Sequence, residues 1–437
     1  MNIILYFREL EQVLFQMSGS VSSSSAGWNT AAGFGVYVLV LTAAYYYNLT
    51  FVQLGLTEFG LEQLGLSMES VAVAMGLLAV ATLVVTLVSG RLMDRYGWGR
   101  NLPLKYRVLF VALLLQSVLT FALDLVASFA GFLVWILLCA VLLGTAIPFA
   151  FSLLLDLVPA GARGYAAGAV TACAFALAAL VPFEWAVGNF VPAAVAVLAP
   201  AAALLGVLSV SPGLLDAGPT GQRSAHSSAP AGRSGLLRVP VVVGVVLLFG
   251  AFFVDSLGFV RIIETPAYVD SAWQSSDYPR RLLLAVAHVA GGVGAGVIYA
   301  RFRHLWLFLA TFVLFATAQF LYVYDIALGG PSMLETGLPL VYVLAVSSYT
   351  TVTFALWPDL ATPETVGTYT AVGVGVGGWL ATFTSTALAL ASDRGQLGLD
   401  VHLMVVGSLS VLFLLLTVLL WYLTAPAPTS GRQPSES

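Results

Sequence analysis

The chain has 437 residues, of which 59% are hydrophobic and only 9% are charged, and its mean hydropathy is +0.96. No soluble domain keeps so much apolar surface away from water, so this composition excludes a soluble globular protein and predicts a polytopic membrane protein. The net charge of −4 and the scatter of basic residues through short loops argue against a nucleic-acid-binding surface. Cys139 and Cys173 both lie in apolar segments and are interpreted as small core residues.

Residues 1–30 precede the first apolar segment of spanning length. The apolar run near Met1 is too short to cross a membrane, and no small-residue cleavage site follows a basic region, so a signal peptide is not expected. Two interpretations stay open for this cytoplasmic arm. It is either an amphipathic arm on the membrane surface or an upstream extension before a second start at Met17, in which case residues 1–16 are not translated.

The next part of the chain alternates between long apolar segments and short polar loops. A helix needs roughly 20 apolar residues to cross a ~30 Å hydrocarbon core. Twelve segments meet this length, namely 31–56, 70–89, 104–126, 129–154, 165–187, 190–210, 239–263, 281–300, 305–327, 338–357, 367–391 and 400–424. A stretch rich in Gly, Pro and Ser separates the sixth from the seventh, which predicts a flexible linker at 211–238.

The loops differ in charge from one side of the predicted membrane to the other. Residues 88–107 form the densest basic cluster and include the only lysine, Lys105. The loops on this side carry eleven basic residues against three on the opposite side, where the acidic residues gather. The positive-inside rule then places residues 88–107 and both termini on the cytoplasmic side of the cell membrane. An even number of spans agrees with both termini lying on the same side. Sixteen arginines against one lysine suggest a prokaryotic source.

Short motifs recur in order at a nearly constant offset. Phe51 begins FVQLGLTE and Phe259 begins FVRIIETP, 208 residues later. The pattern from Gly90 returns at Gly296 after 206 residues, and Asp156-Leu157 returns as Asp359-Leu360 after 203. Three such matches predict a duplication. We therefore expect an all-α membrane protein with two pseudo-symmetric six-helix bundles, 31–210 and 239–424, followed by a cytoplasmic tail at 425–437.

The stretch GRLMDRYGWGR resembles the loop 2–3 signature of the major facilitator superfamily, G-x-L-x-D-R-x-G-R-[RK]. The matching residues are Gly90, Leu92, Asp94, Arg95, Gly97 and Arg100, and Trp98-Gly99 displaces the final basic residue. The weaker copy in the second half ends at Arg301, with Ala300 where the signature has an aspartate. The resemblance implies twelve helices in two halves, and the two halves rock against each other to give alternating access.

What the resemblance implies for single residues is more specific. Asp94 would cap or pair with the start of the eleventh span in the other half, near Glu364 to Gly367, and Arg95 would brace its own half. The alternative is that these residues are ordinary charges that set the topology. The fourth helix keeps Gly144 but lacks the family's preceding arginine, and the fifth lacks the antiporter signature, which disfavours a drug/proton exchanger.

Charged side chains inside a membrane are candidate functional groups. Asp255 lies 16 residues past Val239, or ~24 Å along a helix that rises ~1.5 Å per residue. His288 lies at a similar depth on the next helix, and the two are candidates for a pair or a titrating dyad in substrate or proton handling. For His288 the alternative is hydrogen-bonded packing.

Four further residues are candidates for substrate handling. Tyr47 is the repeat counterpart of Asp255, and the neighbouring Asn48 is costly in lipid and is expected to face the bundle interior. Arg261 and Glu264 lie three residues apart on one helix face. They form either an interfacial ion pair or, in the case of Arg261, a group at the outer mouth that recognises anions.

These features predict a secondary active transporter that moves a small organic solute across the cell membrane, with protons as a candidate coupling ion. The alternatives are a membrane sensor or a polytopic membrane enzyme, although no loop carries a catalytic or metal-binding constellation. We expect no enzymatic activity, no cofactor, no metal, no nucleic-acid partner and a monomer in the bilayer. Acidic and aromatic candidates favour a neutral or cationic solute, while Arg261 leaves anions open.

Overall fold

The computed structural model describes residues 24–181, 187–215, 239–265, 267–268, 275, 277–302, 304–329, 337–394 and 397–424. The predictions for residues 1–23, for most of the linker and for the tail at 425–437 lie outside the described residues. Some side chains inside the described helices, including those of Gln53 and Glu264, are also outside the description.

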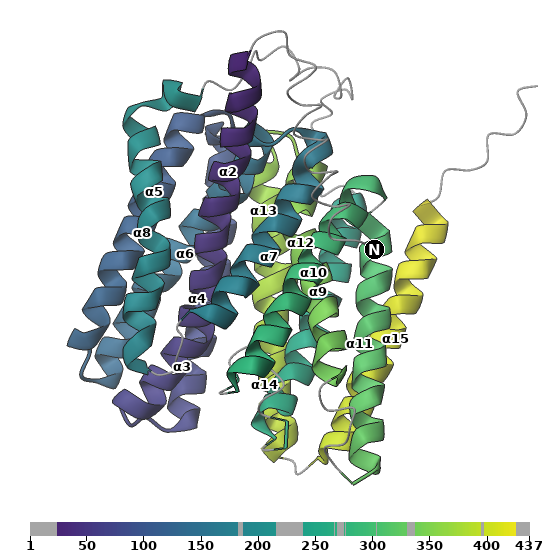
Figure 1. Cartoon of the computed structure of the whole chain (residues 1–437). Helices are drawn as coiled ribbons and strands as arrows, with labels where there is room; N and C mark the ends of the chain where they lie inside the picture. Colours follow the sequence, from purple (N-terminus) through teal and green to yellow (C-terminus); the bar gives the residue numbers. More distant parts are fainter. Residues whose placement is uncertain are drawn as a thin grey trace, which may run out of the picture.

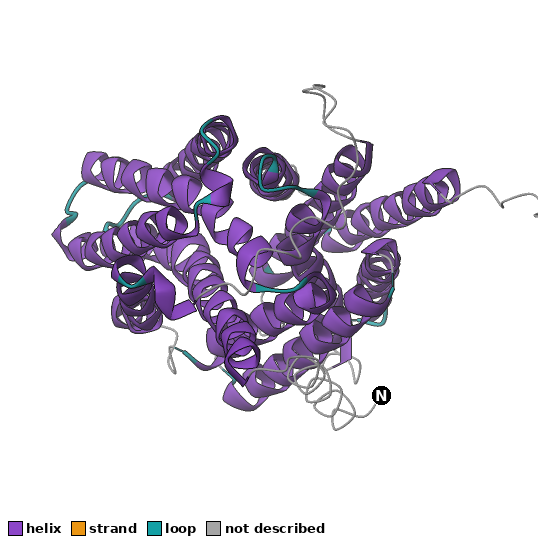
Figure 2. Cartoon of the chain, turned by 90° about the horizontal axis from the view of Figure 1, so that it is seen from above, coloured by secondary structure: helices purple, strands orange, loops and turns teal. Residues whose placement is uncertain are grey.

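Every regular element in the described part of the chain is a helix (Figure 2). The helices of the first half are α2 Ser24–Tyr46, η1 Tyr47–Gly55, α3 Leu56–Glu58, η2 Phe59–Gln63, α4 Met68–Arg95, η3 Trp98–Arg100, α5 Leu102–Phe121, η4 Ala122–Leu125, α6 Phe129–Leu157, η5 Ala160–Ala162, α7 Arg163–Leu180, α8 Val187–Val210 and η6 Pro212–Leu215. Those of the second half are α9 Val239–Glu264, α10 Tyr278–Arg301, α11 His304–Ala327, α12 Gly337–Leu360, α13 Val366–Val374, η9 Gly375–Leu380, α14 Ala381–Arg394 and α15 Leu399–Thr424.

Twelve of the helical segments in the described residues are long and apolar enough to cross a membrane, which confirms the predicted number of spans. Helices suit these sequences because lipid offers no partners to the backbone, so each segment must satisfy its own N–H and C=O groups. Polar side chains complete several helix starts. Ser67, Asn101 and Ser128 accept hydrogen bonds from backbone N–H groups in the first turns of α4, α5 and α6.

The helices form two bundles of six spans (Figure 1), as the repeats predicted. In the first bundle α4 packs on α6 and α5 on α8, and in the second α11 packs on α15 and α9 on α14. The start of α2 and α13 lie at the top of Figure 1, and α3 and α14 lie at the bottom. We call the end that carries residues 96–101 and the start of α13 the basic-loop face, and the other end the opposite face.

Two seams join the bundles. At the first seam α7 packs against α10 through small residues: a Cβ on Gly168 would lie 2.5 Å from the backbone oxygen of Gly292, too close for any side chain. Closer to the opposite face the Phe175 ring stacks on His288 at 3.9 Å. At the second seam α4 packs along α13 and η9. The two halves therefore meet on both sides of a central space.

The first span differs from an ordinary membrane helix. It runs from Thr30 to Gln63, longer than the predicted 31–56, and contains two π-helical stretches, η1 and η2. A π-helix has more residues per turn than an α-helix, so it changes which side chains face each neighbour. This explains why a simple helical periodicity does not predict the direction of every residue in this span.

Candidate functional site

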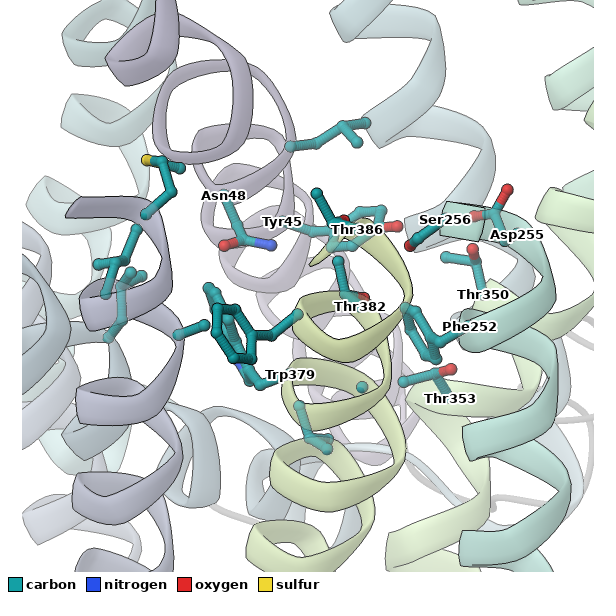
Figure 3. Close-up of a pocket in the computed structure, with 18 of the residues that line it drawn as sticks. Tyr45, Asn48, Phe252, Asp255, Ser256, Thr350, Thr353, Trp379, Thr382 and Thr386 are labelled. Carbon is teal, nitrogen blue, oxygen red and sulfur yellow. The ribbon is translucent and has the colours of Figure 1, made fainter. Parts of the chain in front are cut away.

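A cavity of about 1250 Å³ lies between the two bundles. Its walls come from both halves, with Tyr45 and Asn48 on the first span facing Phe252 and Ser256 on α9 and Trp379 on η9 (Figure 3). Most of its lining is aliphatic or aromatic. A large, mainly apolar pocket with a few convergent polar groups is the usual form of a small-molecule site.

The cavity reaches the opposite face of the molecule. Its lining includes Met68 and Glu69 at the start of α4 and Thr57 in α3. Met68 is 51% exposed, so the cavity meets the surroundings at this end. On α14 the lining continues to Thr386 and Ala387, close to the same end. The central space is therefore open toward the opposite face.

Aromatic side chains close the cavity toward the basic-loop face. The ring of Phe151 on α6 lies 5.7 Å from that of Phe354 on α12, and Tyr45 packs edge-on against Phe354 at 5.0 Å. Beneath them the Tyr37 hydroxyl donates to the backbone oxygen of Phe354 at 3.3 Å. These contacts join the first bundle to the second and form the floor of the cavity.

Asp94 makes a second layer of closure between the bundles. Its carboxylate accepts hydrogen bonds from the backbone N–H groups of Gly367 at 2.8 Å and Thr368 at 2.6 Å, at the start of α13. This is the contact that the resemblance implied. A carboxylate at a helix N-terminus satisfies free N–H groups and interacts favourably with the helix dipole, by roughly 0.3–1 kcal/mol at exposed sites.

Two ion pairs between the bundles lie at the same face. Arg100 pairs with Glu364, with 2.6 Å between Nε and Oε1. Arg163 on α7 pairs with Asp359 on α12 at 2.7 Å, and Tyr299 donates to the other Asp359 oxygen at 2.9 Å. The sequence assigned Arg163 only to topology. The structure shows that it closes the basic-loop face together with Asp359.

The Glu364 carboxyl lies in a loop outside the spanning segments. Partial burial by itself raises the pKa of this group, but hydrogen bonds from Thr362 and Arg100 outweigh it and hold the pKa below its ordinary value of 4.5. Glu364 is therefore ionised near neutral pH, and its contact with Arg100 is an ion pair there.

The only lysine lies at the start of a spanning helix. Lys105 belongs to the first turn of α5, inside the predicted span 104–126, and its side chain is completely buried. Its Nζ lies 2.5 Å from Asp156 on α6. Burial of one charge requires a partner, so Asp156 braces α5 and α6 within the first bundle. The two repeat-related aspartates thus differ, since Asp156 pairs inside a bundle and Asp359 pairs between bundles.

Asp255 lines the cavity. The Tyr342 hydroxyl lies 2.7 Å from the backbone oxygen of Asp255 and 2.9 Å from Oδ1, so its one proton is shared between these two acceptors, and the Tyr349 hydroxyl makes a short hydrogen bond to Oδ2. Figure 3 shows the carboxylate on the α9 wall, pointing away from Asn48. Two phenols therefore hold the carboxylate in place, and no lysine or arginine side chain is among the described residues that line the cavity.

His288 lines the same cavity but has other partners. Its Nδ1 lies 3.0 Å from the Ser347 hydroxyl, and its ring is parallel to that of Phe175. The structure does not form the predicted dyad with Asp255: His288 bonds to Ser347, whereas Asp255 bonds to Tyr342 and Tyr349 on the same helix. The geometry matches the alternative stated for His288, a hydrogen-bonded residue in the packing between α7 and α10.

The three successive tyrosines of the first span point in three directions. Tyr45 lines the cavity, Tyr46 donates to the backbone oxygen of Val181 at 2.7 Å, and Tyr47 lies 2.9 Å from the Thr120 hydroxyl on α5. Tyr47 is fully buried inside the first bundle and does not line the cavity. The repeat offset therefore selected the wrong tyrosine, because the π-helix η1 begins there and breaks the helical register.

Asn48 occupies the predicted position, on the cavity wall and directed into the cavity (Figure 3). Its Oδ1 is buried and has no hydrogen-bond partner among the described residues. A buried acceptor without a partner is costly, by about 1–3 kcal/mol. Asn48 therefore offers a free acceptor to a bound molecule.

Arg261 does not line the cavity. Its side chain is buried near the opposite face, and its Nη2 donates to the backbone oxygen of Leu397 at 3.2 Å. The side chain of Glu264 lies outside the described part of the chain, so the predicted pair is not tested. The anion-binding interpretation of Arg261 loses its basis, because the guanidinium contacts the loop before α15 rather than the central space.

The remaining residues of the predicted gating loop fall in different surroundings. Gly90 touches the second bundle directly: a Cβ there would lie 2.3 Å from the Gly367 oxygen. Arg95 is exposed and lies 5.9 Å from the ring of its neighbour Tyr96. Arg301 ends α10 and is exposed. The backbone of Ala300 packs against Gly164, where a Cβ would lie 2.7 Å from the Ala300 nitrogen.

The sequence analysis missed several residues of the cavity. Tyr342 bonds to Asp255 together with Tyr349, which the sequence offers only as a weaker candidate, and the two tyrosines lie seven residues apart, or two turns of one helix face, which is a spacing that could have revealed Tyr342. Ser256 and Trp379 had no such signal, because isolated polar and aromatic residues are common in membrane helices. No group of three or more metal-ligating side chains occurs in the described residues.

Comparison of the sequence with protein-family models and with curated proteins finds no match. Solved structures do match. The major facilitator superfamily proton:xylose symporter XylE, bound to 6-bromo-6-deoxy-D-glucose, matches with a TM-score of 0.63 at 14% identity over 91% of this chain and 96% of that one. A bacterial homologue of the iron transporter ferroportin, in an outward-facing state, matches with a TM-score of 0.59 at 14% identity, over 89% and 98%. The chain is thus a multi-pass membrane protein with the fold of the major facilitator superfamily.

Proposed function

We propose that the protein is a secondary active transporter that moves a small organic solute by alternating access. The observation that supports this most directly is the central cavity, which is open toward one face and closed toward the other by contacts between two repeat-related bundles. If the bundles rock, these contacts break and other contacts form at the opposite face. Rocking of this kind is how transporters of this architecture expose one site to each side in turn. Solved structures of transporters share the fold.

The lining of the cavity favours a neutral or cationic solute. Asp255 and Glu69 are its charged side chains among the described residues, and both are acidic. An anion would meet these carboxylates without a compensating cation, which costs free energy in surroundings of low polarity. The hydroxyls of Ser256 and Thr353 and the amide of Asn48 supply hydrogen-bonding groups for the solute.

We infer that Asp255 couples transport to protons. A carboxylate without a nearby cation is unfavourable in an apolar setting, and protonation or a bound cation removes the penalty. Tyr342 and Tyr349 hold the ionised form in place by donating to both oxygens. Binding of a proton at this position would change the hydrogen bonds between α9 and α12, which are two helices of the cavity wall.

The orientation follows from the charges. We propose that the basic-loop face and both termini lie in the cytoplasm, because the basic residues gather there. The cavity then faces the outside, and the contacts of Asp94, Arg100 and Arg163 close the inside.

The test is transport by the full chain in proteoliposomes. A thermal-shift screen over sugars, amino acids, nucleosides and amines first identifies a solute that binds. We expect Asp255→Asn to abolish accumulation of this solute under an imposed proton gradient while counterflow exchange continues. Absence of flux under every gradient, with binding intact, would reject a transporter. Normal accumulation by the variant would reject the coupling role.

Asp325→Asn is the matched control. Asp325 is buried and, like Asp255, accepts a hydrogen bond from a tyrosine, Tyr268, at 2.8 Å, but it does not line the cavity. We expect this variant to accumulate the solute under the gradient, even if it lowers the thermal stability.

A further inference from the structure

The cavity touches α4 on more than one side. Residues 71–73 and 75–80 all line it. Successive residues of an α-helix point about 100° apart, so a cavity confined to the bundle interior would contact only those on one face. The central space therefore continues around the side of α4 and reaches the outer surface of the bundle.

The side chains at this lateral extension are apolar and exposed. Val73 and Val80 on α4 are 60% and 46% exposed, and Phe383 on α14 is 36% exposed, although all three line the cavity. From Met68 at the helix start, Val73 lies ~7 Å and Val80 ~18 Å along α4. These depths fall within the hydrocarbon core of a bilayer. The opening between α4 and α14 therefore faces lipid rather than water.

Phe383 lies in the gap between the two helices. A Cβ on Gly76 would be 2.6 Å from Cε2 of the Phe383 ring, so the ring rests on the α4 backbone. Toward the basic-loop face the helices come together again, with Leu83 against Gly375 and Gly90 against Gly367. We call the opening bounded by Val73, Gly76, Val80, Phe383 and Ala387 the α4–α14 portal.

The other seam offers no equivalent opening. There the backbones of α7 and α10 touch at Gly168 and Gly292, the rings of Phe175 and His288 stack, and Ala285 packs in the same cluster as Ala178. Small residues allow this close approach along the helices. Among the described residues that line the cavity, the exposed ones lie on α4 and α14 and none lies on α7 or α10.

We propose that the α4–α14 portal admits an amphipathic organic cation directly from the bilayer, with its cationic head bound at Asp255 and its apolar body along α4 and α14. This substrate class rests on the proposed transport function. An apolar chain exchanges lipid for a lining of Val, Leu and Met at little cost, because lipid tails and these side chains are similarly apolar. Asp255, with no lysine or arginine among the described lining residues, supplies the charge for the head.

The first experiment tests the portal without transport. Ser256→Cys, combined with Cys173→Ser because Cys173 is exposed, places one accessible thiol on the α9 wall of the cavity (Figure 3). A bimane label there, in nanodiscs of phospholipids brominated on the acyl chains, should be quenched as chains enter the portal. Val73→Phe with Ala387→Phe fills the portal and should reduce this quenching about twofold or more.

Val286→Phe is the matched control. Val286 is an exposed apolar residue on α10 that does not line the cavity, so an added phenyl ring on this helix should leave the quenching unchanged. Fluorescence equal to that in unbrominated lipid would overturn the portal.

The second experiment tests the substrate. Decyltrimethylammonium and tetramethylammonium share one head, and their uptake into proteoliposomes is compared. We expect half-saturation by the decyl cation at about tenfold lower concentration. The filled-portal variant should lose about fivefold or more in apparent affinity for the decyl cation, and the half-saturation concentrations of the two cations should move closer together. Equal half-saturation of both cations, or equal effects of Val286→Phe, would overturn the proposal.

The two experiments separate the portal from the proposed function. Quenching without uptake of any solute would retain membrane access and reject transport. Uptake of tetramethylammonium without quenching would retain transport and reject the portal.

Discussion

Gly90 lies where α4 crosses α13, and backbone meets backbone there. An added Cβ would come within 2.3 Å of the Gly367 oxygen and 2.6 Å of the Ala371 side chain. The glycine of the loop signature therefore has a steric reason: without it Asp94, one turn later, would not reach the N–H groups of Gly367 and Thr368.

We predict that Gly90→Ala opens the basic-loop face. The clash falls on a contact between the bundles, so it should destabilise the closed state by about 1–3 kcal/mol, as overpacking does in other cores. A cysteine at Thr353, on the cavity wall, should become more reactive toward a membrane-impermeant maleimide added at the basic-loop face. Gly294→Ala is the control, because a Cβ there meets nothing within 4 Å. Unchanged reactivity in Gly90→Ala would show that this crossing does not hold the face closed.

At the scale of elements, the loop at 96–101 is joined to the start of α13 by the ion pair of Arg100 and Glu364. Both side chains are well exposed, at 69% and 46%. Exposed pairs contribute about 0–1 kcal/mol and weaken with salt. Asp94 is more enclosed and bonds to the backbone, so it carries more of the closure than Arg100 does.

We predict a pH dependence of the closed state below the ordinary carboxyl range. The pKa of Glu364 is held below 4.5 in the closed state by Thr362 and Arg100, and it returns toward the ordinary value when the contact breaks. A depressed pKa favours closure above 4.5, and this contribution is lost as the pH falls through the depressed value. The contribution of the Arg100–Glu364 pair to closure, measured by cysteine reactivity, should therefore stay constant between about pH 8 and 5.

The matched variant is Glu364→Gln, which cannot ionise. It should weaken closure slightly at neutral pH and remove the dependence below the ordinary carboxyl pKa. The same dependence in Glu364→Gln and in the unmodified chain would assign it to another carboxyl.

The two seams differ as whole elements. α7 and α10 are joined along their length by small residues and by the stack of Phe175 on His288. In contrast, α4 and α14 are separated by the α4–α14 portal, where Phe383 rests on Gly76. This asymmetry agrees with the degraded signature at Gly296 to Arg301, where Ala300 packs tightly against Gly164. The repeats have therefore diverged into a closed seam and an open one.

For the whole molecule, the described contacts define one state: closed at the basic-loop face and open at the opposite one. Alternating access requires the contacts of Arg100, Asp94 and Arg163 to break together, because they join the same two bundles. The transition is therefore expected to be a rigid-body rocking of the bundles about the cavity.

We predict that Arg100→Cys with Glu364→Cys, in the Cys173→Ser background, locks this state upon oxidation. Because the two side chains touch across the bundles, a crosslink should abolish uptake, and a reducing agent should restore it. A cysteine introduced at Thr382 should still react with a maleimide added at the opposite face of the locked protein. Each single-cysteine variant serves as a control and should transport under both conditions. Full transport by the crosslinked protein would exclude rocking at this face.

The sequence by itself predicted the twelve spans and the two six-helix bundles, which the structure shows, and it selected Asp255 and Asp94 as candidate functional residues. These properties depend on local hydropathy and on charges that are costly in lipid, and both can be read along one chain. Even the partner of Asp94 was within reach, because the resemblance named the start of the eleventh span.

Only the tertiary structure decided which side chains meet. It separated His288 from Asp255, turned Tyr47 into the first bundle and Tyr45 into the cavity, and moved Arg261 away from the central space. It also paired Arg163 with Asp359 and placed exposed side chains of α4, such as Val73 and Val80, in the cavity lining. The physical reason is that a π-helical register and the contact of two bundles depend on packing between residues far apart in the chain, which periodicity along one helix does not contain.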